Sequence, residues 1–242
     1  MIKLIYIIIL SYFLAGGVGF YFINRQKAPQ VARKSYTKFG VYFIIINILF
    51  FSIVINPVYF KYLSVIIIGG GMLELFFLHQ TTGYKNKGVF LSSLLVFMVL
   101  SYGLFSFSKL SKELILFSFL TLSIFDSFSQ ITGQLWGREK IFPNISPNKT
   151  WGGLAGGSAV ALLSAILLRN LFPGSLFELL ITVAGIIPSA FAGDLGASYY
   201  KRKYLAKDFS NLIPGHGGIL DRFDSLIAGG AWVSLCAWLF NI

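Results

Sequence analysis

Long runs without charge constrain this chain more than any other feature of its sequence. A helix needs about 20 predominantly apolar residues to cross the hydrocarbon core of a bilayer, and uncharged or nearly uncharged runs of that size recur along the whole chain. Eight runs can be placed, at residues 4–23, 40–60, 62–79, 88–107, 114–132, 152–170, 176–198 and 218–240. The sequence therefore predicts an all-α integral membrane protein, a polytopic bundle of about eight transmembrane helices.

The composition leaves no room for a soluble domain. Hydrophobic residues make up 56% of the 242 positions and charged residues only 12%, whereas charged residues make up about 25% of an ordinary soluble domain. Eight spans use about 160 positions, so the remainder suffices only for loops and ends. We expect a single membrane domain.

The distribution of basic residues predicts the orientation of the helices. Basic residues collect in cytoplasmic loops. If the eight helices alternate and the 24–39 loop is cytoplasmic, most of the 20 Lys and Arg residues lie inside. The inner set is Arg25, Lys27, Arg33, Lys34, Lys38, Lys85, Lys87, Arg138, Lys140, Lys149, Lys201, Arg202, Lys203, Lys207 and Arg222. The outer set is Lys3, Lys61, Lys109, Lys112 and Arg169, so both termini should face out.

The basic loop 25–38 has two explanations. It could touch anionic lipid, or it could act only as the topology determinant, and we favour the second because the positive-inside rule accounts for it. The formal net charge of +11 would suggest nucleic acid in a soluble protein. The chain carries no RNA-binding or helix-turn-helix pattern, so we expect no nucleic acid as partner.

The acidic residues are concentrated where a site could form. All five aspartates follow residue 125: Asp126, Asp194, Asp208, Asp221 and Asp224. In the predicted topology each lies at a cytoplasmic helix end or in a cytoplasmic loop. Carboxylates near membrane depth are costly and mark functional sites. We therefore predict a polar site on the cytoplasmic side of the bundle.

One segment combines acids, cations and glycines. Asp194, Ser198, Lys201 and Arg202 share one face if their helix continues. A loop containing Lys207, Asp208 and the run 214–218 (PGHGG) then leads to a helix that opens with Asp221 and carries Asp224 one turn on.

Each part of this segment has an ordinary structural explanation when taken alone. A Lys-Arg pair is usually a topology signal, a glycine-rich loop is usually a turn, and a single histidine such as His216 is usually a structural hydrogen bonder. Together, the carboxylates can bind a hard divalent cation, and the glycines let backbone N–H groups approach a phosphate at a helix N-terminus. The co-occurrence favours a site for a metal-bound polyphosphate.

A second segment, residues 126–153, contributes further polar groups. Asp126 and Gln130 lie one turn apart in an apolar run. Ser146, Lys149 and Thr150 directly precede the sixth run, where hydroxyls can cap the helix or bind an anion. The Walker A pattern is absent. Capping and anion binding both remain open.

Several of these segments together resemble a known family. Residues 198–202 (SYYKR), 207–208 (KD) and 214–224 (PGHGGILDRFD) are similar to the signature of phosphatidate cytidylyltransferases, also called CDP-diacylglycerol synthases. Residues 193–195 (GDL) and 146–151 (SPNKTW) match the same pattern. The resemblance covers about residues 126–230.

The resemblance implies an enzyme of the inner (cytoplasmic) membrane, with its active site facing the cytoplasm. Such an enzyme transfers a cytidylyl group from CTP to phosphatidate, giving CDP-diacylglycerol and pyrophosphate for phospholipid synthesis. The resemblance also implies Mg2+ as cofactor, K+ as a further candidate ion, and a homodimer. Residues 1–113 would form about four N-terminal transmembrane helices, and residues 114–242 the transmembrane catalytic module.

Residue by residue, the resemblance assigns three kinds of role. The metal ligands are Asp194, Asp221 and Asp224. The catalytic residues are Lys201, Arg202, Lys207, Asp208, His216 and Arg222. Position and chemistry, together with the resemblance, predict the substrate-binding residues Ser146, Lys149, Thr150, Ser198, Gly217, Gly218, Asp126 and Gln130, although Gln130 departs from the family pattern.

The N-terminal third carries a weaker resemblance, and two positions depart from the family. Glu74 resembles a family glutamate in the third helix, although it could also be an acid neutralised inside the bundle. Ser129 and Gln130 stand where many members have Ala and Tyr, which bears on the lipid acceptor. Ala197 stands where many members have Glu.

Three other functions remain open at this level. A CTP-dependent lipid kinase would transfer the γ-phosphoryl group, and a cytidylyltransferase could use a different lipid acceptor. A transporter or channel would also place charges in a helix bundle. The product released from labelled CTP separates cytidylyl transfer (pyrophosphate), the kinase (CDP) and a transporter (nothing), and a lipid-acceptor screen identifies the acceptor.

The charge distribution predicts that position 140 is cytoplasmic and that the 109–112 loop is external. In a background that lacks Cys236, a cysteine at position 140 should resist a membrane-impermeant thiol reagent in intact cells. A cysteine at position 109 should react. Labelling of position 140 from outside would contradict the predicted orientation.

Overall fold

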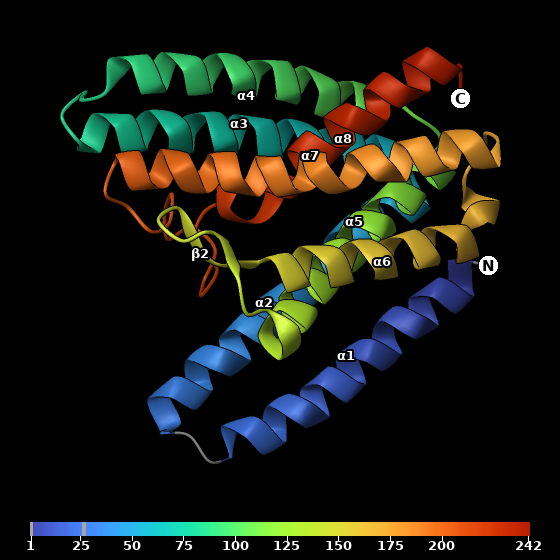
Figure 1. Ribbon diagram of the computed structural model, residues 1–242, viewed down its shortest axis with the longest axis horizontal. Coiled ribbons are helices and arrows are strands. Elements are labelled where there is room, and N and C mark those ends of the chain that lie inside the picture. The colour runs from blue at the N-terminus through green and yellow to red at the C-terminus, as the bar shows by residue number, and fades with distance from the viewer. Residues whose placement is uncertain (1, 26–27) are drawn as a thin grey trace.

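A computed structural model describes residues 2–25 and 28–242, and helices dominate this part of the chain (Figure 1). The helices are α1 (Ile2–Asn24), α2 (Pro29–Ile55), α3 (Pro57–Thr81), α4 (Lys87–Phe107), α5 (Lys112–Trp136), α6 (Trp151–Leu167), α7 (Leu176–Lys203) and α8 (Leu220–Phe240). A 3-10 turn, η1 (Arg169–Leu171), follows α6, and two strands, β1 (Lys140–Phe142) and β2 (Ser146–Thr150), lie between α5 and α6.

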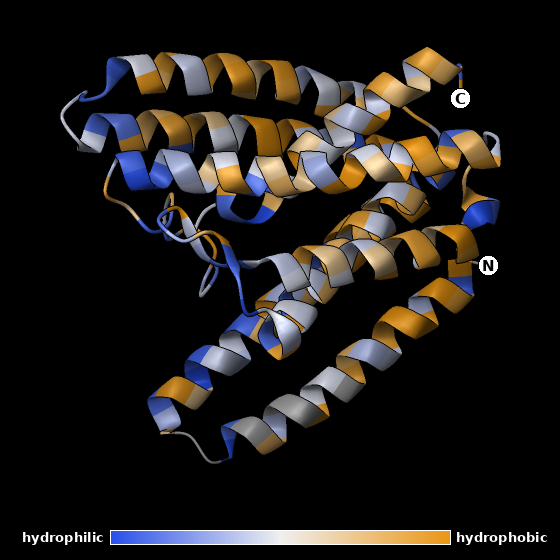
Figure 2. Cartoon of the chain, in the orientation of Figure 1, coloured by the Kyte–Doolittle hydropathy of each residue, from blue (hydrophilic) through white to orange (hydrophobic). Residues whose placement is uncertain are grey.

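The lengths and composition of the helices identify a polytopic membrane protein. Within the described residues, α2, α3, α4, α5, α7 and α8 are each long and apolar enough to cross a membrane. α1 contributes a shorter apolar stretch, Ile2–Val18, and α6 has 17 residues. At 1.5 Å per residue α6 reaches about 26 Å, slightly less than the hydrocarbon core. Figure 2 shows that hydrophobic residues dominate most of these helices.

The predicted boundary between the second and third runs is wrong. The two runs were expected to divide at Lys61, but the helices are separated at Asn56, and Lys61 lies inside α3. Pro57 occupies the first turn of α3, where its missing N–H costs nothing, and the Asn56 side chain accepts a hydrogen bond from the N–H of Val58 at 3.0 Å.

The predicted loop 24–39 is also mostly helical. α2 begins at Pro29 and carries the basic residues 33–38 in its first turns. Charged side chains at a helix end can reach water, so charge alone does not end a helix. Lys27, which we assigned to the inner set, lies outside the described residues.

The all-α prediction missed a small hairpin. β1 and β2 are antiparallel, with Lys140 opposite Thr150, Phe142 opposite Ser146 and an irregularity between the two pairs. The N–H of Trp151 donates to the carbonyl of Glu139 at 3.1 Å, so the hairpin ends where α6 begins. The hairpin is too short to show the alternating pattern by which strands are predicted.

α8 and α5 form the interior of the bundle. More than half of the apolar window of each is buried, 56% in both cases. α8 packs against α7 and α4 and also contacts α3, whereas α5 pairs with α6. Both termini lie at one end of the molecule, and the α3–α4 turn, the hairpin and the α7–α8 loop lie toward the other (Figure 1). This arrangement agrees with alternating spans.

The close packing of α6 on α5 depends on glycines. A Cβ atom on Gly153 would lie 2.6 Å from the carbonyl oxygen of Ser129, and a Cβ atom on Gly157 would overlap the Ser129 hydroxyl. Small residues allow two membrane helices to approach closely and gain van der Waals contact. The glycines of α6 therefore hold the hairpin and its polar residues beside α5.

The variant Gly153→Ala should destabilise the protein because its Cβ meets backbone rather than a movable side chain. We expect a loss of about 1–3 kcal/mol, as for other overpacked sites, measured by thermal unfolding in detergent. Gly69→Ala in α3 is the matched control, because a Cβ there has nothing within 4 Å. Equal melting temperatures for the two variants would contradict this account of the α5–α6 contact.

Candidate functional site

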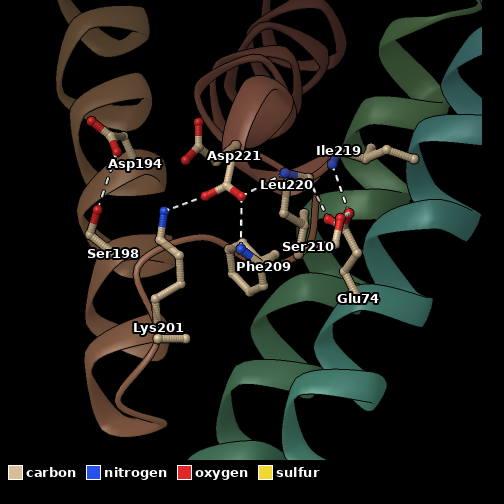
Figure 3. A network of polar contacts seen from close by, with 12 residues as sticks. Glu74, Asp194, Ser198, Lys201, Phe209, Ser210, Ile219, Leu220 and Asp221 are labelled. Atoms are coloured by element: carbon tan, nitrogen blue, oxygen red, sulfur yellow. Dashed lines mark hydrogen bonds and ion pairs between the residues drawn. The ribbon is translucent and has the colours of Figure 1, made fainter. Parts of the chain in front are cut away.

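A buried ion pair joins α7 to α8 at the loop end of the bundle. Lys201 Nζ lies 2.5 Å from Asp221 Oδ1, and the side chains are only 9% and 2% exposed. Lys201 extends from the last turns of α7 and Asp221 stands in the first turn of α8 (Figure 3). Each charge requires the other, because an isolated ion at this depth would be very costly.

The second oxygen of Asp221 organises the α7–α8 loop. Asp221 Oδ2 accepts hydrogen bonds from the N–H groups of Phe209 and Gly218, each at 2.8 Å. Phe209 is itself buried and stacks on Tyr200, with ring centroids 5.8 Å apart. Asp221 therefore fixes both ends of the loop that carries residues 207–218.

Glu74 contacts the same region from the opposite side. Its carboxylate accepts hydrogen bonds from the N–H groups of Ile219 and Leu220, both at 2.8 Å, and from the Ser210 hydroxyl at 2.7 Å (Figure 3). Glu74 lies in the C-terminal third of α3 and is 6% exposed. The contacts satisfy its charge in a buried position.

These contacts change the expected role of the α8 N-terminus. From the sequence, the glycine-rich backbone before α8 was expected to bind a phosphate. In the structure, the N–H groups of Gly218, Ile219 and Leu220 donate to Asp221 and Glu74. The protein's own carboxylates therefore occupy three successive donors that a phosphate would need.

A second ion pair attaches the hairpin to α7. Lys149 Nζ, at the end of β2, lies 2.6 Å from Asp194 Oδ2 and 4.1 Å from the centre of the Phe191 ring. The Ser198 hydroxyl donates to Asp194 Oδ1 at 3.4 Å, one turn along α7. Of the predicted shared face of Asp194, Ser198, Lys201 and Arg202, this hydrogen bond joins Asp194 and Ser198.

The neighbours of Lys149 show how the motif before α6 is used. The Thr150 side chain accepts a hydrogen bond from the N–H of Gly153 at 3.1 Å, so Thr150 caps α6. Ser146 begins β2 and is half-buried. Thr150 thus caps α6, whereas its neighbour Lys149 forms the ion pair with Asp194.

Three carboxylates from three helices face a common region. Asp194 of α7 interacts electrostatically with Asp126 of α5 and with Asp224 of α8, and Asp126 and Asp224 also interact with each other. The positive charges of Lys149 and Arg222 act on Asp126, and that of Lys201 acts on Asp224. Like charges gathered in this way repel one another, so a further cation would stabilise them.

These carboxylates have the donor chemistry of a site for a hard divalent cation. Among residues 2–25 and 28–242, however, no three His, Cys, Asp or Glu side chains are arranged closely enough to hold an ion. Asp224 Oδ1 accepts the N–H of Ser225 at 2.7 Å, and both oxygens of Asp221 are engaged. Asp126, Asp194 and Asp224 fit the ion chemically, whereas Asp221 could join them only if its present partners moved.

The other predicted cations lie at the surface around this region. Arg202 is exposed, and its guanidinium donates to the carbonyls of Ile145 at 3.3 Å and Ala206 at 2.9 Å. Lys207 and Arg222 are also exposed. Asp208 is exposed beside Gly217, whose φ of +85° suits glycine. Arg202 thus points to the loop and hairpin, away from the buried pair.

His216 and Gln130 occupy the edges of the region. The His216 ring stacks on Tyr42 with centroids 6.4 Å apart. Burial, together with the nearby charges of Arg222 and Lys38, lowers the pKa of His216 below its ordinary value. The neutral imidazole therefore prevails at pH 7 and suits a hydrogen-bonding role. Gln130 is exposed near the end of α5.

Sequence reasoning missed the long-range partners that assemble this region. Neither the pairing of Lys201 with Asp221 nor that of Lys149 with Asp194 follows from local spacing, and Glu74 contacts residues 136 to 146 positions away. The available signal was a single acid in a long apolar helix, since such a residue requires a partner.

The fold and the site define a class, a multi-pass membrane protein with carboxylates and cations gathered at one end of its helices. Comparison with known proteins narrows the class. The chain belongs to the Cytidylyltransferase family, which it matches over residues 5–240.

Named relatives cover most of the chain. A phosphatidate cytidylyltransferase from Rickettsia bellii is 31% identical over 221 residues, which are 84% of this chain and 93% of that protein. The protein of the same name from Rickettsia felis is 35% identical over 191 residues, 72% of this chain and 81% of its own length. That from Staphylococcus saprophyticus is 35% identical over 158 residues, 62% and 61% respectively.

The two ion pairs should differ in their contribution to stability. Asp221→Asn leaves the Lys201 charge buried without a partner and should cost about 3–5 kcal/mol. Asp194→Asn breaks a partly exposed pair and should cost less than about 1 kcal/mol. Thermal unfolding in detergent measures both. If Asp194→Asn proves as destabilising as Asp221→Asn, burial does not determine how much each ion pair contributes to the stability of the protein.

Proposed function

We propose that the protein transfers the cytidylyl group of CTP to phosphatidate, producing CDP-diacylglycerol and pyrophosphate. Membership of the family and the names of three relatives support this activity. The structural observation that carries the proposal is the meeting of Asp126, Asp194 and Asp224 with Lys149 at the loop end of membrane-spanning helices. A water-soluble nucleotide and a lipid head group can both reach such a position.

The chemistry requires two anions to meet. A phosphate oxygen of phosphatidate attacks the α-phosphorus of CTP, and the bond from that phosphorus to the bridging oxygen of pyrophosphate breaks. The attacking oxygen is already ionised, so no general base is required. Lys149, Arg202, Lys207 and Arg222 reduce the repulsion between the substrates and hold them in line for displacement.

Buried residues preserve the geometry of this region. Lys201 and Asp221 fix the separation of α7 and α8, and Ser198 orients Asp194. His216 and Asp208 shape the loop, with Gly217 and Gly218 allowing its close approach to the acids. Ser146 and Thr150 position the hairpin beside the nucleotide.

We infer that Asp194, Asp224 and Asp126 supply the ligands of Mg2+, which would draw their carboxylates closer together than they lie in this structure. When bound, the ion would neutralise phosphate charge and polarise the reacting phosphoryl group. Asp221 is a further ligand only if its bonds to Lys201 or the loop are exchanged. The role of K+ stays a prediction, as do the homodimer, the inner-membrane location and the cytoplasmic orientation of the site.

An apolar cavity supports a lipid as the second substrate. It has a volume of about 1150 Å3 and lies between α4, α7 and α8. Asp224 and Gly193 line one part of it, and apolar residues such as Leu235 and Trp238 line the part nearer the C-terminus. Acyl chains can remain there while the phosphate reaches the acids. Gln130, exposed near the end of α5, would contact the lipid's polar backbone through hydrogen bonds rather than through a tyrosine. The Ser129 hydroxyl is buried against Gly157 of α6, so the predicted contact of Ser129 with the lipid is wrong.

Purified protein should convert CTP and phosphatidate to CDP-diacylglycerol with release of one pyrophosphate for each lipid formed. EDTA should abolish the reaction and Mg2+ should restore it, because the acids without a cation repel CTP. Asp194→Asn should lower the rate on the order of 100-fold or more. Mass spectrometry of the lipid and a pyrophosphate assay measure these outcomes.

Three results would contradict parts of the proposal. Release of CDP with a phosphorylated lipid alcohol would identify a lipid kinase. A rate at least ten times higher with another phospholipid acid would show that phosphatidate is not the acceptor. Full activity in EDTA would contradict the role of the metal.

A further inference from the structure

We propose that Glu74 is a positioning residue for the active site, a role that rests on the proposed cytidylyl transfer. Glu74 belongs to α3, in the N-terminal half of the chain, and its carboxylate closes the N-terminus of α8 (Figure 3). It thereby holds the helix that carries Asp221, Arg222 and Asp224.

The contacts of Glu74 resemble those of a helix cap supplied by another helix. Glu74 Oε1 accepts the N–H of Ile219 and the hydroxyl of Ser210, and Oε2 accepts the N–H of Leu220. The N-cap residue of α8, Ile219, is apolar, so its own side chain makes no capping hydrogen bond. A carboxylate suits these three donors, and the positive end of the helix dipole adds to the attraction.

The approach is so close that it restricts the neighbouring position. A Cβ atom on Gly218 would overlap the Glu74 carboxylate. The glycine that we expected to admit a phosphate therefore admits a side chain of α3. This gives Gly218 a structural role in bringing α3 and α8 together.

Adjacent residues of α3 contact both helices that carry the acids. The Tyr200 hydroxyl donates to the carbonyl of Leu75 at 2.7 Å, and Tyr200 directly precedes Lys201. Glu74 binds residues 219 and 220, directly before Asp221. One turn of α3 thus fixes the backbone beside each partner of the Lys201–Asp221 pair, and with it the spacing between Asp194 and Asp224.

Loss of the Glu74 charge should disturb catalysis through this spacing. In Glu74→Gln one carboxylate oxygen becomes an NH2 group, which cannot accept a hydrogen bond from a backbone N–H. Either the N–H of Ile219 or the N–H of Leu220 then faces an NH2 group and loses its acceptor. Because Asp221 binds the adjacent N–H of Gly218, its position relative to Lys201 changes as well.

The test measures kcat, the KM for each substrate and the folded fraction of Glu74→Gln in detergent. We expect kcat per folded molecule to fall at least 10-fold, while both KM values stay within about threefold of wild type. The deficit should persist at temperatures well below the melting transition, because a purely structural role would lower the melting temperature without lowering kcat per folded molecule. Glu113→Gln is the matched control, since Glu113 is exposed in the first turn of α5.

A second variant keeps the test decisive if Glu74→Gln does not fold. Ser210→Ala removes one donor to Glu74 and should lower kcat severalfold with little change in stability. Ser210→Ala added to Glu74→Gln should cause little further loss, because both changes act on one contact. Wild-type kcat in folded Glu74→Gln, or in Ser210→Ala when only that variant folds, would overturn the proposal.

Failure of the proposed function gives a different result. If the wild-type protein does not convert CTP and phosphatidate, cytidylyl transfer is wrong. The position of Glu74 can then still be judged from melting temperatures, which should be non-additive for Glu74→Gln and Ser210→Ala. Additive melting temperatures would overturn the placement of Glu74 at the α8 N-terminus.

Discussion

The cost of burying charge among membrane helices governs the arrangement of this protein. Lys201 and Asp221 neutralise each other's buried charge. The second oxygen of Asp221 accepts hydrogen bonds from backbone N–H groups of the loop between their helices. The ion pair therefore links the end of α7 to the start of α8 and, through Asp221, to the loop between them. The partly exposed acids and cations around the pair can then serve substrates, because the scaffold does not depend on them to the same extent.

The placement of the site reflects the different solubilities of its proposed substrates. Apolar helices retain a lipid, and their loop ends are accessible to a nucleotide. The hairpin β1–β2 extends this surface, because its strand β2 brings Lys149 into contact with Asp194 of α7. Glycines in α6 make this possible by bringing the base of the hairpin against α5. Packing inside the bundle is thus connected directly to the charge pattern at its end.

Much of the fold could be predicted because bilayer thickness imposes a length on every span. The boundary at Asn56 could not be found from charge, since the charged residue in this region, Lys61, lies inside α3, one turn after Pro57. The hairpin was missed because its two short strands show no alternation. Among site residues, the grouping of Asp194, Ser198 and Lys201 followed from helix periodicity. The contacts of Glu74 did not, because they join segments about 140 residues apart and depend on tertiary packing.

The close pairing of Lys201 with Asp221 also has a consequence for how the protein attracts its substrates from solution. At short range the two charges cancel, so the buried pair adds little to the electric field outside. Long-range attraction of an anionic nucleotide falls instead to exposed groups such as Arg202, Lys207 and Arg222. Their field is screened over about 8 Å at physiological ionic strength, whereas the buried pair is largely shielded from salt. Salt therefore slows the capture of the nucleotide while leaving the internal architecture intact.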